Sequence, residues 1–292
     1  MTPPQSHRES LGGIGMDLMY VTRQVTVIEP GHFEVFCKEN VKQMATPSDE
    51  AALLELCRKR VKSFAESKYN TNTYFSGKEN PAFRRAAVLV PIFVKEGALH
   101  VLLTLRSEEL PTFKGQVAFP GGKQEDGDKD VVETALREAK EEVGLSPEIV
   151  EVVAVLCPLV TRNKKLHAYV YPVIGIIKSS FELVVNTSEV QTTFEVPLNF
   201  FLHKETHREG TMIFKGEEIS ITFFDYETNA RDQTEPVTFV IWGLTASVCL
   251  KVSVAALNKL PEYHLDEYYS DLEEYIKQVN SQQDKIKCLS KV

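Results

Sequence analysis

Three glutamates on one predicted helix are the residues of this 292-residue sequence best suited to chemistry. Glu138 precedes Glu141 and Glu142 by three and four positions, and residues at these spacings share one helix face. Repulsion between such carboxylates costs a helix roughly 0.2–0.5 kcal/mol per pair. A divalent cation reverses the sign of that interaction, because Mg²⁺ prefers carboxylate oxygens and keeps water ligands beside a phosphate substrate. The pattern therefore indicates a metal site, and its alternative is a solvated acidic helix face.

The segment around these glutamates carries the start and stop signals of a helix. Asp130 is expected to cap the N-terminus, with Glu133 completing a capping box, and Gly144 is expected to end the helix. The apolar positions needed for packing against a sheet also recur at helical spacing: Val132, Ala135, Leu136, Ala139 and Val143. A turn, Pro120-Gly121-Gly122, precedes the helix and exposes backbone carbonyls to a metal and amides to phosphate. This turn favours the metal site over the solvated face.

The elements around this segment predict an α+β domain with a mixed β-sheet. Thr46 and Pro47 mark the start of a leading helix, whose expected apolar face is Leu53, Leu56, Cys57, Val61 and Phe64. Two aliphatic runs after Arg85, parted by Lys95-Glu96-Gly97, predict a strand pair. Further strands are expected at 151–160, 168–177, 181–185, 211–215, 218–224 and 237–241, and helices around 244–258 and 264–279.

The same patterns divide the chain into four segments. They are an N-terminal extension, disordered in part, at 1–45; a leading helix and connection at 46–82; a catalytic domain at 83–260; and a C-terminal helix and tail at 261–292.

The composition excludes few functions. The net charge of −8 argues against bulk nucleic-acid binding, which needs a basic surface, but not against a small phosphorylated ligand. The five cysteines are scattered without CxxC spacing, which favours a reducing compartment and no zinc site. The longest uncharged apolar stretch, Val237–Leu250, is shorter than the ~20 residues of a spanning helix, so no membrane span is expected.

The stretch Arg137–Leu145, REAKEEVGL, resembles the second half of the Nudix box, R-E-U-x-E-E-x-G-U with U aliphatic. The first half departs from the family pattern. Fourteen residues instead of thirteen separate Gly122 from Arg137, and Lys129 stands where the family has glutamate. Asp128 and Asp130 flank that lysine, and a one-residue insertion lets one of them substitute for the structural glutamate.

A second motif is similar to the signature of the coenzyme A diphosphatases within that superfamily. It comprises Leu102–Ser107 (LLTLRS), Gly115 and Phe119–Gly122 (FPGG). Pro111 replaces the arginine usual in the spacer, and Lys114 is the nearest basic residue. The resemblance implies a Nudix αβα sandwich with a mixed sheet between helices. It also implies hydrolysis of coenzyme A and acyl-CoA at the pyrophosphate, with Mg²⁺ or Mn²⁺, to 3′,5′-ADP and (acyl-)4′-phosphopantetheine.

The resemblance also implies a role for each candidate residue. Glu138 and Glu142 are the expected metal ligands, with Glu141 as a third ligand or base and a glycine carbonyl as a further ligand. Arg137 is expected to orient the carboxylates, and Glu189 to act as a distal general base, its alternative being an exposed loop acid. The expected substrate contacts are Arg106, which we assign to the 3′-phosphate of coenzyme A, then Lys114, Gly121, Gly122 and Lys123; the alternative for Arg106 is an ordinary surface arginine.

Two rival functions remain open at this point. A Nudix enzyme acting on NADH, ADP-ribose or a capped RNA end needs the same helix, so only the coenzyme A signature argues against it. A non-catalytic nucleotide-sensing module is expected to have lost helix glutamates that are all present here. Ser290-Lys291-Val292 resembles the peroxisomal Ser-Lys-Leu address read by an import receptor. We therefore expect a peroxisomal protein, with the cytoplasm or mitochondrion as alternatives.

Overall fold

The computed structural model describes residues 46–72, 75–162, 167–214, 217–228, 236–266 and 269–289. The expected extension 1–45 and the tripeptide Ser290–Val292 lie outside these ranges. Within them, no helix is long and apolar enough to cross a membrane.

The described strands form a mixed sheet built around one central strand, β1 (Arg84–Lys95). β1 pairs in parallel with β7 (His167–Ile177), and antiparallel with both β2 (Ala98–Arg106) and β4 (Gly121–Lys123). The strands completing this sheet are β3 (Val117–Ala118) and β8 (Val190–Pro197) beside β2, and β5 (Val150–Val155) and β6 (Leu159–Arg162) beside β7. A smaller antiparallel sheet comprises β9 (His207–Phe214), β10 (Glu217–Thr228) and β11 (Val237–Trp242).

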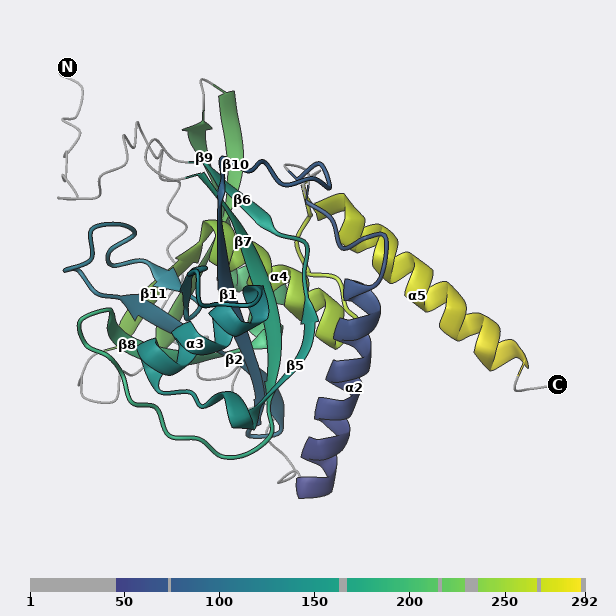
Figure 1. The fold of residues 1–292 in the computed structure, drawn as a ribbon. Coiled ribbons are helices and arrows are strands. Elements are labelled where there is room, and N and C mark those ends of the chain that lie inside the picture. Colours follow the sequence, from purple (N-terminus) through teal and green to yellow (C-terminus); the bar gives the residue numbers. More distant parts are fainter. Residues whose placement is uncertain are drawn as a thin grey trace, which may run out of the picture.

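Helices cover both faces of the mixed sheet and give the expected αβα sandwich. α3 (Val131–Val143) lies in front of the sheet in Figure 1 and α4 (Gly243–Leu257) behind it. α2 (Pro47–Ala65) packs on the α4 side, and α5 (Ser270–Leu289) runs away from the body toward the C-terminus. Because side chains alternate along β1, Ala87 and Leu89 enter the core under α3, whereas Val90 and Ile92 enter the core under α2 and α4.

Local sequence signals account for the element boundaries nearest the site. Glu96 and Gly97 both have positive φ (52° and 74°), so the β1–β2 hairpin turns through two residues in the left-handed region, as tight hairpins require. Thr46 caps α2, and its hydroxyl and the Asp49 carboxylate form a capping box. The expected leading helix and the helix near 244–258 are both confirmed.

Four expectations about elements were wrong. The alternating segment 181–185 is not a strand: its apolar side chains pack against the α3 core, but no neighbouring strand pairs with its backbone. The expected strand 151–160 is two strands, β5 and β6. The last helix begins at Ser270 and continues to Leu289. Leu56, placed on the buried face of α2, is 42% exposed.

Candidate active site

The helix that carries the three glutamates begins and ends at the expected residues. Asp130 caps α3 by accepting hydrogen bonds from the N–H groups of Val132 and Glu133. The Glu133 carboxylate accepts from the N–H of Lys129 rather than from that of Asp130, so the expected capping box is only half formed. Gly144 ends the helix with φ 72°, a conformation that glycine adopts without strain.

Glu142 is the most buried carboxylate of the site, with 3% of its side chain exposed. Its Oε2 accepts a hydrogen bond from the N–H of Gly121 at 3.0 Å, and its Oε1 lies 3.4 Å from Nη1 of Arg106. Burial raises the pKa of Glu142 to about 7, although the Gly121 N–H and the Arg106 charge act in the opposite direction. The charged form of such a buried acid is unstable unless a positive charge lies beside it.

Glu138 lies directly against the glycine turn. A Cβ added to Gly122 would stand 2.5 Å from Cδ of Glu138, so no residue larger than glycine fits beside this carboxylate without displacing it. Burial raises the pKa of Glu138 as well, with Glu141 and Glu189 adding to the increase and Arg137 opposing it. The turn and the helix therefore hold two partly desolvated carboxylates near one another.

Arg137 and Asp128 form the clamp that fixes the loop before α3. Nε and Nη2 of Arg137 donate to the two carboxylate oxygens of Asp128, each at 2.9 Å. This fork-to-fork pair holds the pKa of Asp128 well below its usual value. Asp130 caps the helix instead, so of the two aspartates that flank Lys129 it is Asp128 that pairs with Arg137. The sequence had left the choice between them open.

The remaining donors of Arg137 reach two of the helix glutamates and the end of β4. Nη1 donates to Glu138 Oε1 at 3.0 Å and to Glu141 Oε2 at 3.1 Å, and Nη2 donates to the carbonyl of Lys123 at 3.2 Å. Glu141 is 54% exposed. The carboxylate oxygens of Glu138, Glu141 and Glu142 do not all lie within 4.8 Å of one another, although the helical spacing of these residues allows it. In the described ranges, only His203, Glu205 and Glu262 bring three possible ligand atoms within 4.8 Å of one another.

Arg106 comes to the site from the end of β2, and Glu189 from the turn before β8. The Nε of Arg106 is buried without a hydrogen-bond partner in the described structure. The carbonyl of Glu189 accepts from the N–H of Ser107, and its carboxylate accepts from the Asn186 side chain at 3.2 Å. Asn186 also donates its backbone N–H to the carbonyl of Glu142. Sequence reasoning missed Asn186 as a link between Glu142 and Glu189.

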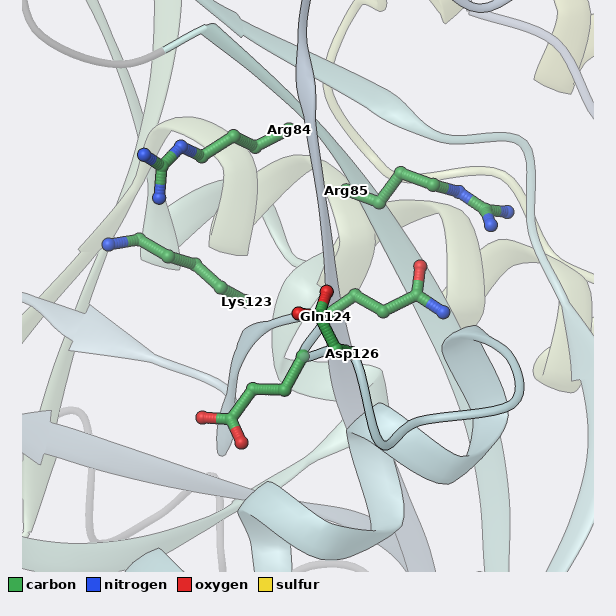
Figure 2. Close-up of a pocket in the computed structure, with 6 residues that line it drawn as sticks. Arg84, Arg85, Lys123, Gln124 and Asp126 are labelled. Atoms are coloured by element: carbon green, nitrogen blue, oxygen red, sulfur yellow. The ribbon is translucent and has the colours of Figure 1, made fainter. Parts of the chain in front are cut away.

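Lys114 and Lys123, the two expected lysine contacts, lie on different elements. Lys114 is half-buried in the loop between β2 and β3, flanked by Phe113 and Gly115 with positive φ, and it makes no side-chain hydrogen bond or ion pair with another described residue. Lys123 lies at the end of β4 and lines an open pocket of about 380 Å³ (Figure 2). Sequence reasoning also missed Arg84, which lines the same pocket.

The residues around the Gly121–Gly122 turn fit a divalent cation on chemical grounds. They offer hard oxygen donors, namely the carboxylates of Glu138, Glu141 and Glu142, beside a backbone turn that leaves no room for a side chain. Two of these carboxylates have raised pKa values because they are desolvated without a full complement of positive charge. A bound cation would supply that charge, and the unpartnered Nε of Arg106 is a donor suited to a phosphate oxygen.

Comparisons with known proteins show which family the sequence resembles. Residues 83–214 match the model of the NUDIX domain. The chain is 37% identical over 186 residues to the peroxisomal coenzyme A diphosphatase of Mus musculus. The aligned residues are 64% of this chain and 76% of the relative. It is 40% identical over 183 residues to the mitochondrial Nudix hydrolase 15 of Arabidopsis thaliana, covering 62% of this chain but only 61% of that relative, less than two thirds of its length.

A third relative and one solved structure complete the comparison. The chloroplastic Nudix hydrolase 22 of Arabidopsis thaliana is 36% identical over 214 residues, 70% of this chain and 68% of the relative. The crystal structure of a MutT/nudix family protein from Enterococcus faecalis superposes with a TM-score of 0.39 at 16% identity, covering 79% of this chain and 80% of that one.

Proposed function

The chain belongs to the Nudix hydrolases, and from this premise we propose that it hydrolyses the pyrophosphate bond of coenzyme A and acyl-CoA. The products are 3′,5′-ADP and (acyl-)4′-phosphopantetheine. The observation that carries the proposal is the segment resembling the coenzyme A signature. It runs from β2 through β4 and contributes Arg106, Gly121 and Gly122 to one centre with Glu142. The similarity to a coenzyme A diphosphatase over 76% of that relative supports the same substrate.

Hydrolysis of a diphosphate requires that its negative charge be stabilised while water attacks phosphorus. Nudix hydrolases generally use divalent cations, and Mg²⁺ or Mn²⁺ held by Glu138, Glu142 and Glu141 would neutralise phosphate oxygens and lower the pKa of a bound water. Arg106 stands beside Glu142 with a free Nε, so it is placed to donate to a phosphate oxygen. Arg137 holds Glu138 and Glu141 in place from its clamp on Asp128.

The proton of the attacking water needs an acceptor among the chain's own carboxylates. Glu141, half-exposed and fixed by Arg137, is one candidate, and Glu189, oriented by Asn186, is the other. Glu141→Gln and Glu189→Gln distinguish them: the variant that lacks the base is expected to lose turnover together with the fall of kcat at acidic pH that protonation of the base causes, whereas a variant that lacks only a metal ligand is rescued in part by raising the Mn²⁺ concentration.

The decisive experiment is a product assay on coenzyme A, acetyl-CoA, NADH and ADP-ribose with Mg²⁺ present. We expect the highest kcat/KM for coenzyme A or acetyl-CoA, with 3′,5′-ADP released in equal amount to the phosphopantetheine product. A preference for NADH or ADP-ribose would replace the proposed substrate and leave the Nudix chemistry intact. Binding without turnover of any member of the panel would favour a nucleotide-sensing module.

We propose a peroxisomal location, with the cytoplasm or mitochondrion as alternatives. A relative named as peroxisomal supports the first, and one named as mitochondrial supports the last. A fluorescent protein fused ahead of the full chain, with and without Ser290–Val292, tests the proposal. Punctate peroxisomal signal that becomes diffuse on deletion is expected, and an unchanged pattern contradicts recognition of that tripeptide by an import receptor.

A further inference from the structure

We infer that Arg84 and Lys123 form an anion subsite for the 3′-phosphate on the adenosine half of the substrate, an inference that rests on the proposed function. Both residues line the pocket beside β4. Figure 2 shows their side chains extending to the same side of β1, while Arg85 and Gln124 extend to the other side. The strand register explains this arrangement, because Lys123 pairs with Ala86, two residues beyond Arg84 and on the same face.

These two cations lack the partners that neighbouring arginines have. Arg85 forms an ion pair with Glu79 and lies over the ring of Tyr171, and Arg137 is held by Asp128. In the described ranges, neither Arg84 nor Lys123 makes an ion pair or a side-chain hydrogen bond. Like charges at neighbouring same-face positions of paired strands repel one another. A bound phosphate would turn that repulsion into two charge-assisted contacts.

The position of the pair relative to the reaction centre suits a group one ribose away from the diphosphate. The outer edge of β4 faces the catalytic helix: the Gly121 N–H donates to Glu142, and the Lys123 carbonyl accepts from Arg137. The side chain of Lys123 extends from the face of the same strand, on the side where Arg84 lies. A nucleotide whose 5′-diphosphate lies at the edge can therefore reach Arg84 and Lys123 with its 3′-substituent by passing over a single three-residue strand.

The chemistry of the rest of the pocket matches a phosphate that has a hydroxyl beside it. β1 and β4 supply the cations, whereas the loop after β4 supplies the carboxylates of Glu125 and Asp126. Cationic donors suit the 3′-phosphate and carboxylate acceptors suit the neighbouring 2′-hydroxyl. Arg106, to which the sequence assigned the 3′-phosphate, lies against Glu142 at the centre itself, where its charge serves the diphosphate common to all Nudix substrates.

The test compares coenzyme A with dephospho-CoA, which lacks only the 3′-phosphate. For each protein the measured quantity is the ratio of the two kcat/KM values. We expect Arg84→Ala and Lys123→Ala each to lower this ratio about tenfold, the smaller effect of a charged hydrogen bond at an exposed position. Arg84→Lys should restore most of the ratio. Lys129→Ala is the matched control, since it removes a charge from the same loop outside the pocket, and it should leave the ratio unchanged.

A binding measurement separates failure of the subsite from failure of the proposed function. Calorimetry with 3′,5′-ADP and 5′-AMP should show a preference for 3′,5′-ADP that Arg84→Ala abolishes. If coenzyme A is a good substrate but both the ratio and this preference survive in the variants, the subsite is refuted and the proposed function stands. If coenzyme A is not hydrolysed but the variants lose the preference, the proposed function is refuted and the subsite stands.

Discussion

Glu142 should make the metal-free protein less stable as the pH rises. Its pKa is about 7 in the folded protein against 4.5 for the ordinary carboxyl, so between these values the folded chain binds a proton that the unfolded chain releases. The free energy of unfolding therefore falls as the pH increases from 4.5 to 7 and stays low above 7. At 1.36 kcal/mol per pKa unit, this shift is worth about 3 kcal/mol.

Glu142→Gln removes this titration and keeps an oxygen that can accept from the Gly121 N–H. Urea unfolding of both proteins in EDTA, at intervals between pH 4.5 and 8, gives the difference in free energy of unfolding. We expect the free energy of unfolding of the variant, relative to that of the wild type, to increase by up to about 3 kcal/mol as the pH rises across this range. Glu141→Gln is the matched control because Glu141 is half-exposed, and its profile should follow that of the wild type.

Adding Mg²⁺ should reverse the effect in the wild type alone, since a bound cation supplies the charge that the buried carboxylate lacks. Parallel pH profiles of wild type and Glu142→Gln in EDTA would refute the view that Glu142 is held as a desolvated acid. Equal stabilisation of the two proteins by Mg²⁺ would refute its role as a metal ligand.

Three further outcomes test other parts of the site. Turnover should require Mg²⁺ or Mn²⁺ and fall at least ~100-fold in Glu142→Gln, because an unneutralised diphosphate repels hydroxide; full activity in EDTA would exclude this mechanism. Gly122→Ala should lower kcat at least ~10-fold, since its Cβ would collide with Glu138, whereas Gly127→Ala, with open space at its Cβ, should be neutral in the same assay. Asp128→Ala should lower the free energy of unfolding by about 1.5–3 kcal/mol, measured by denaturant titration. Because the pKa of Asp128 is depressed, this difference should be present above pH 3.8 and shrink as the pH falls further; a difference independent of pH would contradict the ion pair with Arg137.

The sequence by itself determined the helix that carries the three glutamates. Asp130 and Gly144 define the ends of α3 through hydrogen bonds and backbone angles within a few residues. The apolar spacing of the same segment defines the face that packs against the sheet. These signals are local, so the positions of Glu138, Glu141 and Glu142 on one helix could be read from the residues alone. The αβα sandwich was expected only from the resemblance of the motifs to the Nudix family.

Alternation of apolar residues was a weaker guide, because it reports burial and not pairing. The segment 181–185 alternates and is partly buried, yet it runs beside the end of α3, where the N–H of Val184 donates to the carbonyl of Val143. A strand needs a neighbour that offers a ladder of donors and acceptors, and no feature of the segment itself shows whether one exists.

Only the tertiary structure decided how the charges of the site are shared. Asp128 and Asp130 are equivalent by spacing, but the loop turns Asp128 to Arg137 and leaves Asp130 to cap the helix. Arg106 and Glu142 lie 36 positions apart in the sequence and 3.4 Å apart in the structure. The pairing of β1 with β4 brings Arg84 and Lys123 to one face of the sheet. The reason is physical: a helix cap depends on atoms a few residues away, whereas an ion pair between distant residues depends on which strands the whole sheet brings together.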